Sequence, residues 1–152
     1  MELRHIIKQG RSIIPVAANK QAMVDWKEYG RRLPRPDEIE RWIASSPPRW
    51  AVVTGFLSRL VTLDFDGEAG LERMRRLGLK PHRRTPHGCH VDFEWEGSAL
   101  KTGALEPGVD VRGENGYIIV LGEGYDWLPD YRPRRTLPSA LDVRRLRVPF
   151  EG

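Results

Sequence analysis

Two aspartates stand two positions apart at the end of an apolar run, in the sequence LVTLDFD of residues 60–66. Because side chains alternate between the two faces of a strand, Asp64 and Asp66 would project from one face, with Cα atoms about 6–7 Å apart. Two like charges at this distance repel each other unless a cation lies between them. Such an all-oxygen environment favours a hard divalent ion, Mg²⁺ or Mn²⁺.

His90, Asp110 and Arg112 follow the same alternating pattern in two further segments, residues 89–95 and 108–112. Each segment would have one apolar face and one face of ionisable groups. If Asp110 lies on a strand beside the aspartate pair, three carboxylates could hold two ions about 4 Å apart. Such a site stabilises the attacking and the leaving oxygen together, which is the chemistry of phosphoryl and nucleotidyl transfer.

The elements that must position these groups follow from local sequence signals. Strands are expected at residues 13–17, 50–54, 60–66, 89–95, 108–112 and 117–121, and helices at residues 37–44, 68–77 and from 139 onward. The segment 26–29 is expected to be a loop. Asn115-Gly116 readily takes the positive φ of a tight turn, which predicts a hairpin between residues 108–112 and 117–121.

Together these elements predict an α/β (α+β) fold in which residues 1–152 form a single domain. A mainly antiparallel sheet would carry the acids, with helices on its apolar face and its ionisable face open to a cleft. An N-terminal αβ element would close one side of this cleft. A chain of 152 residues, 39% of them hydrophobic, is long enough for one real core.

Composition limits the partners of the chain. No apolar run approaches the roughly 20 residues that span a bilayer, so no membrane partner is expected. One cysteine, Cys89, permits no internal disulfide and suits a reducing cytoplasm. The net charge of +4 favours a polyanionic partner. Arginine-rich stretches at residues 73–84 and 132–147 each read alone as solvated surface, but together they flank the acids like a nucleic-acid track.

Taken in order, these segments resemble the primase-polymerase (prim-pol) branch of the archaeo-eukaryotic primase superfamily, found in plasmid, phage and mobile-element replication proteins. Residues 60–66 resemble its first motif, an apolar strand that ends in Asp-x-Asp. The sequence TPHGCH of residues 85–90 resembles the second motif, a turn that leads to a strand carrying a histidine. Residues 107–120 resemble the third. The similarity covers roughly residues 12–127.

The resemblance implies a template-directed nucleotidyltransferase, a DNA primase and polymerase of replication or repair, with an RRM-like catalytic core. Asp64, Asp66 and Asp110 would be catalytic and would bind two Mg²⁺ or Mn²⁺ ions, and His90 would contact the triphosphate of the incoming nucleotide. The partners would be nucleoside triphosphates and a DNA template and primer. A helicase would belong to another domain or protein, because the chain has no Walker A sequence.

Arg112 is a candidate for nucleotide binding on reach and charge rather than on the motif. It shares a face with Asp110 and could reach a phosphate; a salt bridge to a neighbouring acid is the alternative. Two features depart from the family pattern. The loop of residues 121–127 is shorter than in many relatives, and Asp92 and Glu94 add negative charge near the expected phosphate site.

Two other functions share parts of this pattern. The sequence DFDG of residues 64–67 is similar to the nucleophile motif of haloacid dehalogenase-type phosphatases, although Glu68 replaces the Thr or Val that normally follows. That fold also needs parallel strands that alternate with helices. The second alternative is a catalytically weak module that binds nucleic acid or nucleotides, which metal-dependent extension of a primed template distinguishes from an enzyme.

Overall fold

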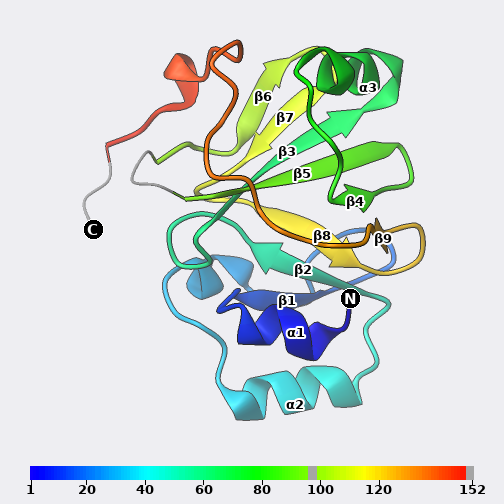
Figure 1. The fold of residues 1–152 in the computed structure, drawn as a ribbon. Helices are drawn as coiled ribbons and strands as arrows, with labels where there is room; N and C mark the ends of the chain where they lie inside the picture. The colour runs from blue at the N-terminus through cyan, green and yellow to red at the C-terminus, as the bar shows by residue number, and fades with distance from the viewer. Residues whose placement is uncertain (96–98, 150–152) are drawn as a thin grey trace.

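Two antiparallel sheets are joined in the computed structural model, which describes residues 1–95 and 99–149 (Figure 1). The large sheet contains, in spatial order, β6 (Gly103–Glu106), β7 (Val109–Arg112), β3 (Leu60–Asp66), β5 (Gly88–Glu94), β4 (Arg83–Arg84) and β9 (Asp126–Trp127). The small sheet contains β1 (Ile13–Val16), β2 (Arg49–Val53) and β8 (Tyr117–Leu121). The α-helices are α1 (Leu3–Lys8), α2 (Pro36–Ala44) and α3 (Gly67–Arg76), and the 3₁₀ helices are η1 (Trp26–Gly30) and η2 (Arg144–Leu146).

This arrangement confirms the α+β class and the antiparallel sheet predicted from the sequence. The short elements α1, β4, β6 and β9 were not predicted, and η1 replaces the loop expected at residues 26–29. Elements of two to six residues contain too few positions for a periodic pattern to be recognised. Within the described part of the chain, no helix has the length and apolar character needed to cross a membrane.

Alternate side chains of β3 point to opposite faces of the large sheet, and one of these faces is apolar. Val61, Leu63 and Phe65 are buried in one core, which α3 and the segment 137–146 cover. Burial of each such side chain stabilises the fold by roughly 1.5–3 kcal/mol. The helix predicted from residue 139 onward is wrong, because this segment is irregular until η2. Its buried residues Leu141, Val143 and Leu146, with the half-buried Leu137, have spacings that do not form one helical stripe.

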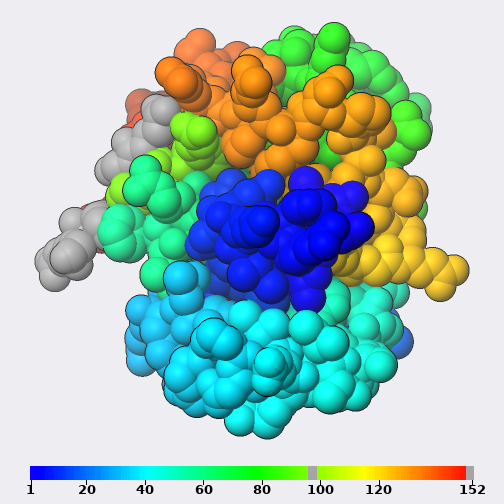
Figure 2. All heavy atoms as spheres, turned by 60° about the horizontal axis from the view of Figure 1, so that its bottom comes forward, coloured from blue at the N-terminus to red at the C-terminus, as the bar shows by residue number. Residues whose placement is uncertain are grey.

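The small sheet is buried on both faces, which explains why its strands have successive apolar residues. On one face Ile6 of α1 packs with Ile13 and Val52. On the other face Tyr29 of η1 packs with Ile14. Figure 2 shows α1 (dark blue) at the surface between α2 (cyan) and the segment that follows β9 (orange).

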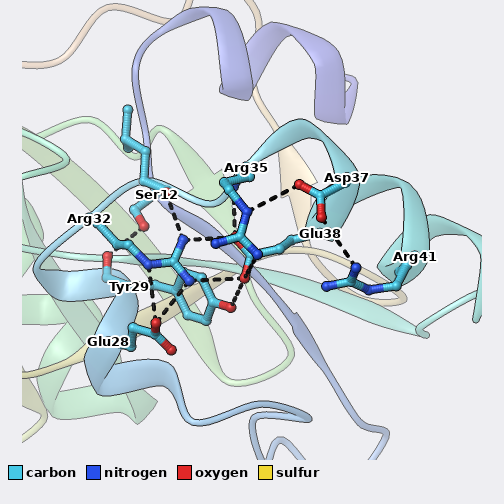
Figure 3. A network of polar contacts seen from close by, with 9 residues as sticks. Ser12, Glu28, Tyr29, Arg32, Arg35, Asp37, Glu38 and Arg41 are labelled. Carbon is cyan, nitrogen blue, oxygen red and sulfur yellow. Dashed lines mark hydrogen bonds and ion pairs between the residues drawn. The ribbon is translucent and has the colours of Figure 1, made fainter.

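A buried carboxylate fastens α2 to η1 (Figure 3). Glu38 accepts a hydrogen bond from the Tyr29 hydroxyl at 2.5 Å and two from the Arg32 guanidinium at 2.7 and 3.0 Å. These donors, Arg32 foremost, hold the pKa of Glu38 well below its usual range. The Ser12 hydroxyl donates to the carbonyl of Tyr29 at 2.5 Å, so the network also reaches the start of β1.

The chain crosses between the sheets at residues 113–116, where the sequence predicted a hairpin. That prediction is wrong: β7 pairs with β3 and β6, whereas β8 pairs with β2. Asn115 does take a positive φ of 59°, but a turn does not choose the partner of the strand that follows it. Residues 118–120 are successively buried: Ile118 and Val120 pack in the core on one face of the small sheet, and Ile119 packs in the core on the other face. The sequence also predicted that an N-terminal αβ element closes one side of the cleft. The small sheet on that side contains β8 as well as the N-terminal strands β1 and β2.

Two crossings between the sheets are tied to each other. The Thr54 hydroxyl donates to the carbonyl of Gly113 at 2.6 Å, and the Glu114 carboxylate accepts the backbone N–H of Phe56 at 2.8 Å. Gly55 has a φ of +106°, and a Cβ there would lie 1.9 Å from a carboxylate oxygen of Glu114. The link from β2 to β3 and the link from β7 to β8 therefore form one joint, held by these hydrogen bonds.

Gly88 of β5 lies opposite Asp66 of β3, and a Cβ there would lie 1.8 Å from the carbonyl oxygen of Phe65. We expect Gly88→Ala to lower the free energy of unfolding by about 2–4 kcal/mol, because rigid backbone cannot yield. Gly30→Ala is the control, since its Cβ would meet only Val53 Cγ1 at 3.6 Å. Urea unfolding measures both, and a Gly88→Ala protein as stable as wild type would contradict this packing.

Candidate functional site

A row of three ionisable side chains crosses the large sheet. Asp64 on β3 is paired with His90 on β5 on one side and with Asp110 on β7 on the other. Directly opposed residues of neighbouring strands have Cβ atoms about 4.5–5.5 Å apart. Asp66 lies two residues further along β3 and projects from the same face. The structure thus brings the acids and the histidine of the three motifs onto one face of the large sheet.

The small sheet covers one end of this face. Leu60, at the start of β3, packs with Val52 and Ile118 in a core of the small sheet. The cover ends further along the strand, where the side chain of Asp64 is 12% exposed and Asp66 is exposed. The two aspartates therefore lie where the polar face emerges.

A cleft of about 380 Å³ opens at this point. The large sheet contributes Asp64, Asp66, His90 and Arg112 to its lining, and the remainder includes Lys20, Trp26, Tyr117, Ile119 and Tyr125. The rings of Trp26 and Tyr117 pack edge to face, with centroids 5.2 Å apart. Ionisable groups thus face an aromatic wall, whose residues were not among those predicted from the sequence.

Asp110 and Arg112 differ in their relation to the cleft. The side chain of Asp110 is 41% exposed and lies outside the cleft lining, although the backbone places it beside Asp64. The Nη2 atom of Arg112 lies 3.8 Å from Oδ2 of Asp110, which makes a loose ion pair. Across residues 1–95 and 99–149, no three His, Cys, Asp or Glu side chains are placed to hold a metal ion as they stand.

Asp64 lies among negative charges that are only partly compensated. Burial and the neighbouring charge of Asp66 raise the pKa of Asp64 to about 7; Arg112 opposes this rise, and Asp110 adds to it. Carboxylate oxygens are the ligands that Mg²⁺ and Mn²⁺ prefer. The donor set therefore fits a divalent cation at Asp64 and Asp66, with a third carboxylate one strand away.

His90 is buried beside Asp64. Burial and the positive charge of Arg83 lower the pKa of His90 to about 3, so the imidazole is neutral near neutral pH. Its Nδ1 accepts a hydrogen bond from Nε–H of Arg83 at 3.1 Å, and its Nε2 lies 3.6 Å from Oδ1 of Asp64. The Nε2 edge of the ring therefore faces the aspartate.

The positions of Arg83 and Asp92 were not predicted. The sequence places Arg83 in a basic surface stretch and assigns no role to Asp92, whereas the structure buries both as an ion pair. Arg73 of the same stretch binds Glu106 at 2.6 Å, so this stretch offers less free positive charge than its composition indicates. A signal existed in the sequence, because an acid two positions from His90 inside an apolar strand needs a buried partner.

Comparison with protein families gives one match. A sequence model named Prim-Pol, described as the N-terminal part of bifunctional DNA primase/polymerase, matches residues 3–140. This range contains the three strand motifs and every residue of the cleft lining named above. No curated protein matches the chain.

The raised pKa of Asp64 predicts a pH-dependent stability in protein freed of metal by a chelator. Its folded pKa of about 7 lies above the ordinary 3.8, so the folded state binds more protons between these values. Stability from this group is therefore lost as pH rises from about 4 to 7. Asp64→Asn removes the ionisable group, and we expect it to be more stable than wild type at pH 8 by roughly 1–3 kcal/mol.

The comparison is made by urea unfolding at pH 4 and pH 8, where the advantage of Asp64→Asn should shrink at the lower pH. Asp37→Asn is the control: this exposed aspartate on α2 is paired with Arg35 and Arg41, so its replacement should bring no gain of stability at pH 8. An Asp64→Asn protein less stable than wild type at pH 8 would contradict the raised pKa of Asp64.

Proposed function

The chain belongs to the Prim-Pol family, the N-terminal domain of bifunctional DNA primase/polymerases, and from this premise we propose that it is a template-directed nucleotidyltransferase. The 3′-hydroxyl of a primer paired with a DNA template would attack the α-phosphorus of a nucleoside triphosphate, so that the nucleoside monophosphate is joined to the primer and pyrophosphate leaves. The observation that carries this proposal is the row of Asp64, His90 and Asp110 across three strands, beside a cleft that Asp66 also lines.

Asp64 and Asp66 would hold divalent cations in this reaction, and Asp110 would complete the donor set. The position of Asp64 supports this role, because burial and the neighbouring charge of Asp66 both disfavour its ionised form and a cation would stabilise that form. When bound, Mg²⁺ or Mn²⁺ would lower the pKa of the attacking hydroxyl, which makes it a better nucleophile, and would neutralise charge on the leaving oxygens.

His90 and Arg112 would hold the triphosphate. The neutral imidazole can donate one hydrogen bond from Nε2, which faces Asp64. Arg112 adds positive charge in the cleft lining. Its side chain is 34% exposed and only loosely paired with Asp110, at 3.8 Å, which supports a phosphate contact rather than a purely structural ion pair.

The aromatic wall of the cleft suits the nucleoside part of the substrate. Trp26, Tyr117 and Tyr125 offer ring surfaces to a base that lies opposite the acids. Stacking on aromatic side chains tolerates any base, because every base has a π-face. This tolerance is what a polymerase needs when the template, rather than the protein, selects the nucleotide.

The phosphatase alternative finds no support in the fold. A haloacid dehalogenase-type nucleophile belongs to a parallel sheet, whereas the strand of Asp64 is antiparallel to both of its neighbours. The binding-only alternative is distinguished by the following experiment.

Primer extension with labelled nucleotides and Mg²⁺ or Mn²⁺ tests the proposal. We expect Asp64→Asn and Asp66→Asn each to lower incorporation by more than about 100-fold, since loss of even outer-shell partners of a metal costs about 10–100-fold. Asp37→Asn on α2 is the matched control and should extend primers like wild type. Extension by Asp64→Asn at the wild-type rate would sink the assignment, and nucleotide binding by wild type without any extension would favour the binding-only module.

A further inference from the structure

A fully buried ion pair lies behind His90. Arg83 is 0% exposed and Asp92 is 1% exposed, and their two hydrogen bonds are both 2.7 Å long. Asp92 also accepts hydrogen bonds from the hydroxyls of Thr62 and Tyr131, each at 2.7 Å. The carboxylate is therefore saturated with donors, and it holds both terminal nitrogens of the guanidinium.

The third nitrogen of Arg83 serves a different partner. With Nη1 and Nη2 on Asp92, the remaining Nε–H donates to Nδ1 of His90 at 3.1 Å. The guanidinium stays protonated in proteins and has no acceptor atom. Nδ1 must therefore be an acceptor, and the single proton of the neutral ring must lie on Nε2. A protonated ring would set two N–H donors against each other.

We propose that Arg83 is a positioning residue that holds His90 as the Nε2–H tautomer and fixes its ring orientation. His90 then presents one hydrogen-bond donor beside Asp64, where Nε2 lies 3.6 Å from Oδ1. The identity of the acceptor, a phosphate oxygen of the incoming nucleotide, rests on the function proposed above. The tautomer itself rests only on the contacts of Arg83.

The chemistry of the pair explains why an arginine occupies this position. Two charges removed from water gain little stability on balance, and apolar residues of similar volume often replace such a pair without loss. Stability alone therefore gives no reason to keep it. The planar guanidinium can satisfy Asp92 with one edge and His90 with another, whereas a lysine ammonium has all its donors on one atom. The ring of Trp127, 4.4 Å from the guanidinium carbon, further fixes the plane.

The test combines nitrogen-15 NMR of the His90 ring with steady-state kinetics. In wild type near neutral pH, we expect a protonated Nε2 and an unprotonated Nδ1. In Arg83→Lys we expect a mixture of tautomers, and the KM for the nucleotide should rise roughly 10-fold with a smaller change in kcat. The double variant Arg83→Leu, Asp92→Leu removes both charges of the pair together. It allows the His90 tautomer and the nucleotide KM to be measured should the lysine variant fail to fold.

Tyr131→Phe is the matched control. It removes another donor to the same carboxylate and leaves the contact between Arg83 and His90 in place. Its tautomer and nucleotide KM should equal those of wild type even where its unfolding midpoint falls.

Two results would overturn the inference: a single Nε2–H tautomer with unchanged KM in both Arg83 variants, or the same tautomer mixture in Tyr131→Phe. The function proposed above can fail separately. Should wild type bind no nucleotide and extend no primer, a tautomer shift confined to the Arg83 variants still supports the positioning role of Arg83.

Discussion

A charged side chain on a covered sheet face must meet water, an opposite charge or a ligand, because its burial alone costs several kcal/mol. The polar face of the large sheet shows the first two outcomes directly. Asp66 is exposed to water, and Asp92 is paired with Arg83. Asp64 is largely buried, and burial together with the neighbouring charge of Asp66 raises its pKa, an effect that Arg112 only partly opposes. The unbalanced position is the one that a cation would complete.

Exposure to water increases along the polar face of β3 from Leu60 to Asp66, because this face is covered at only one end by the small sheet. Its core reaches Leu60, and the cover ends before Asp66. Its own position depends on the joint in which Thr54 and Glu114 hold the two crossings together. The network around Glu38 then keeps η1 and α2 on the outer side of the same sheet (Figure 3). The small sheet therefore influences the charges in the cleft mainly by excluding water from part of the polar face of the large sheet.

The buried ion pair of Arg83 and Asp92 and the aspartate pair in the cleft lining belong to one system. His90 stands between them, with Nδ1 toward Arg83 and Nε2 toward Asp64. Arg83, whose charge is balanced by Asp92, thus contacts the back of the His90 ring, while the front of the ring faces Asp64 in the cleft. In metalloproteins the partners behind a ligand commonly orient it in this way. Here the same logic applies to a hydrogen-bond donor.

The sequence by itself determined the strands that carry the chemistry. Residues 60–66 and 117–121 form strands with the predicted bounds, and the apolar alternation of β3, β5 and β7 assigned the core face correctly, because side-chain alternation is a local property of an extended chain. Only the tertiary structure decided which strands pair. The turn at Asn115 has the predicted conformation, yet β8 joins the small sheet, since burial of both its faces outweighs local reversal of the chain. The buried state of Arg83 was likewise beyond a local pattern, because desolvation depends on what the rest of the chain places over a residue.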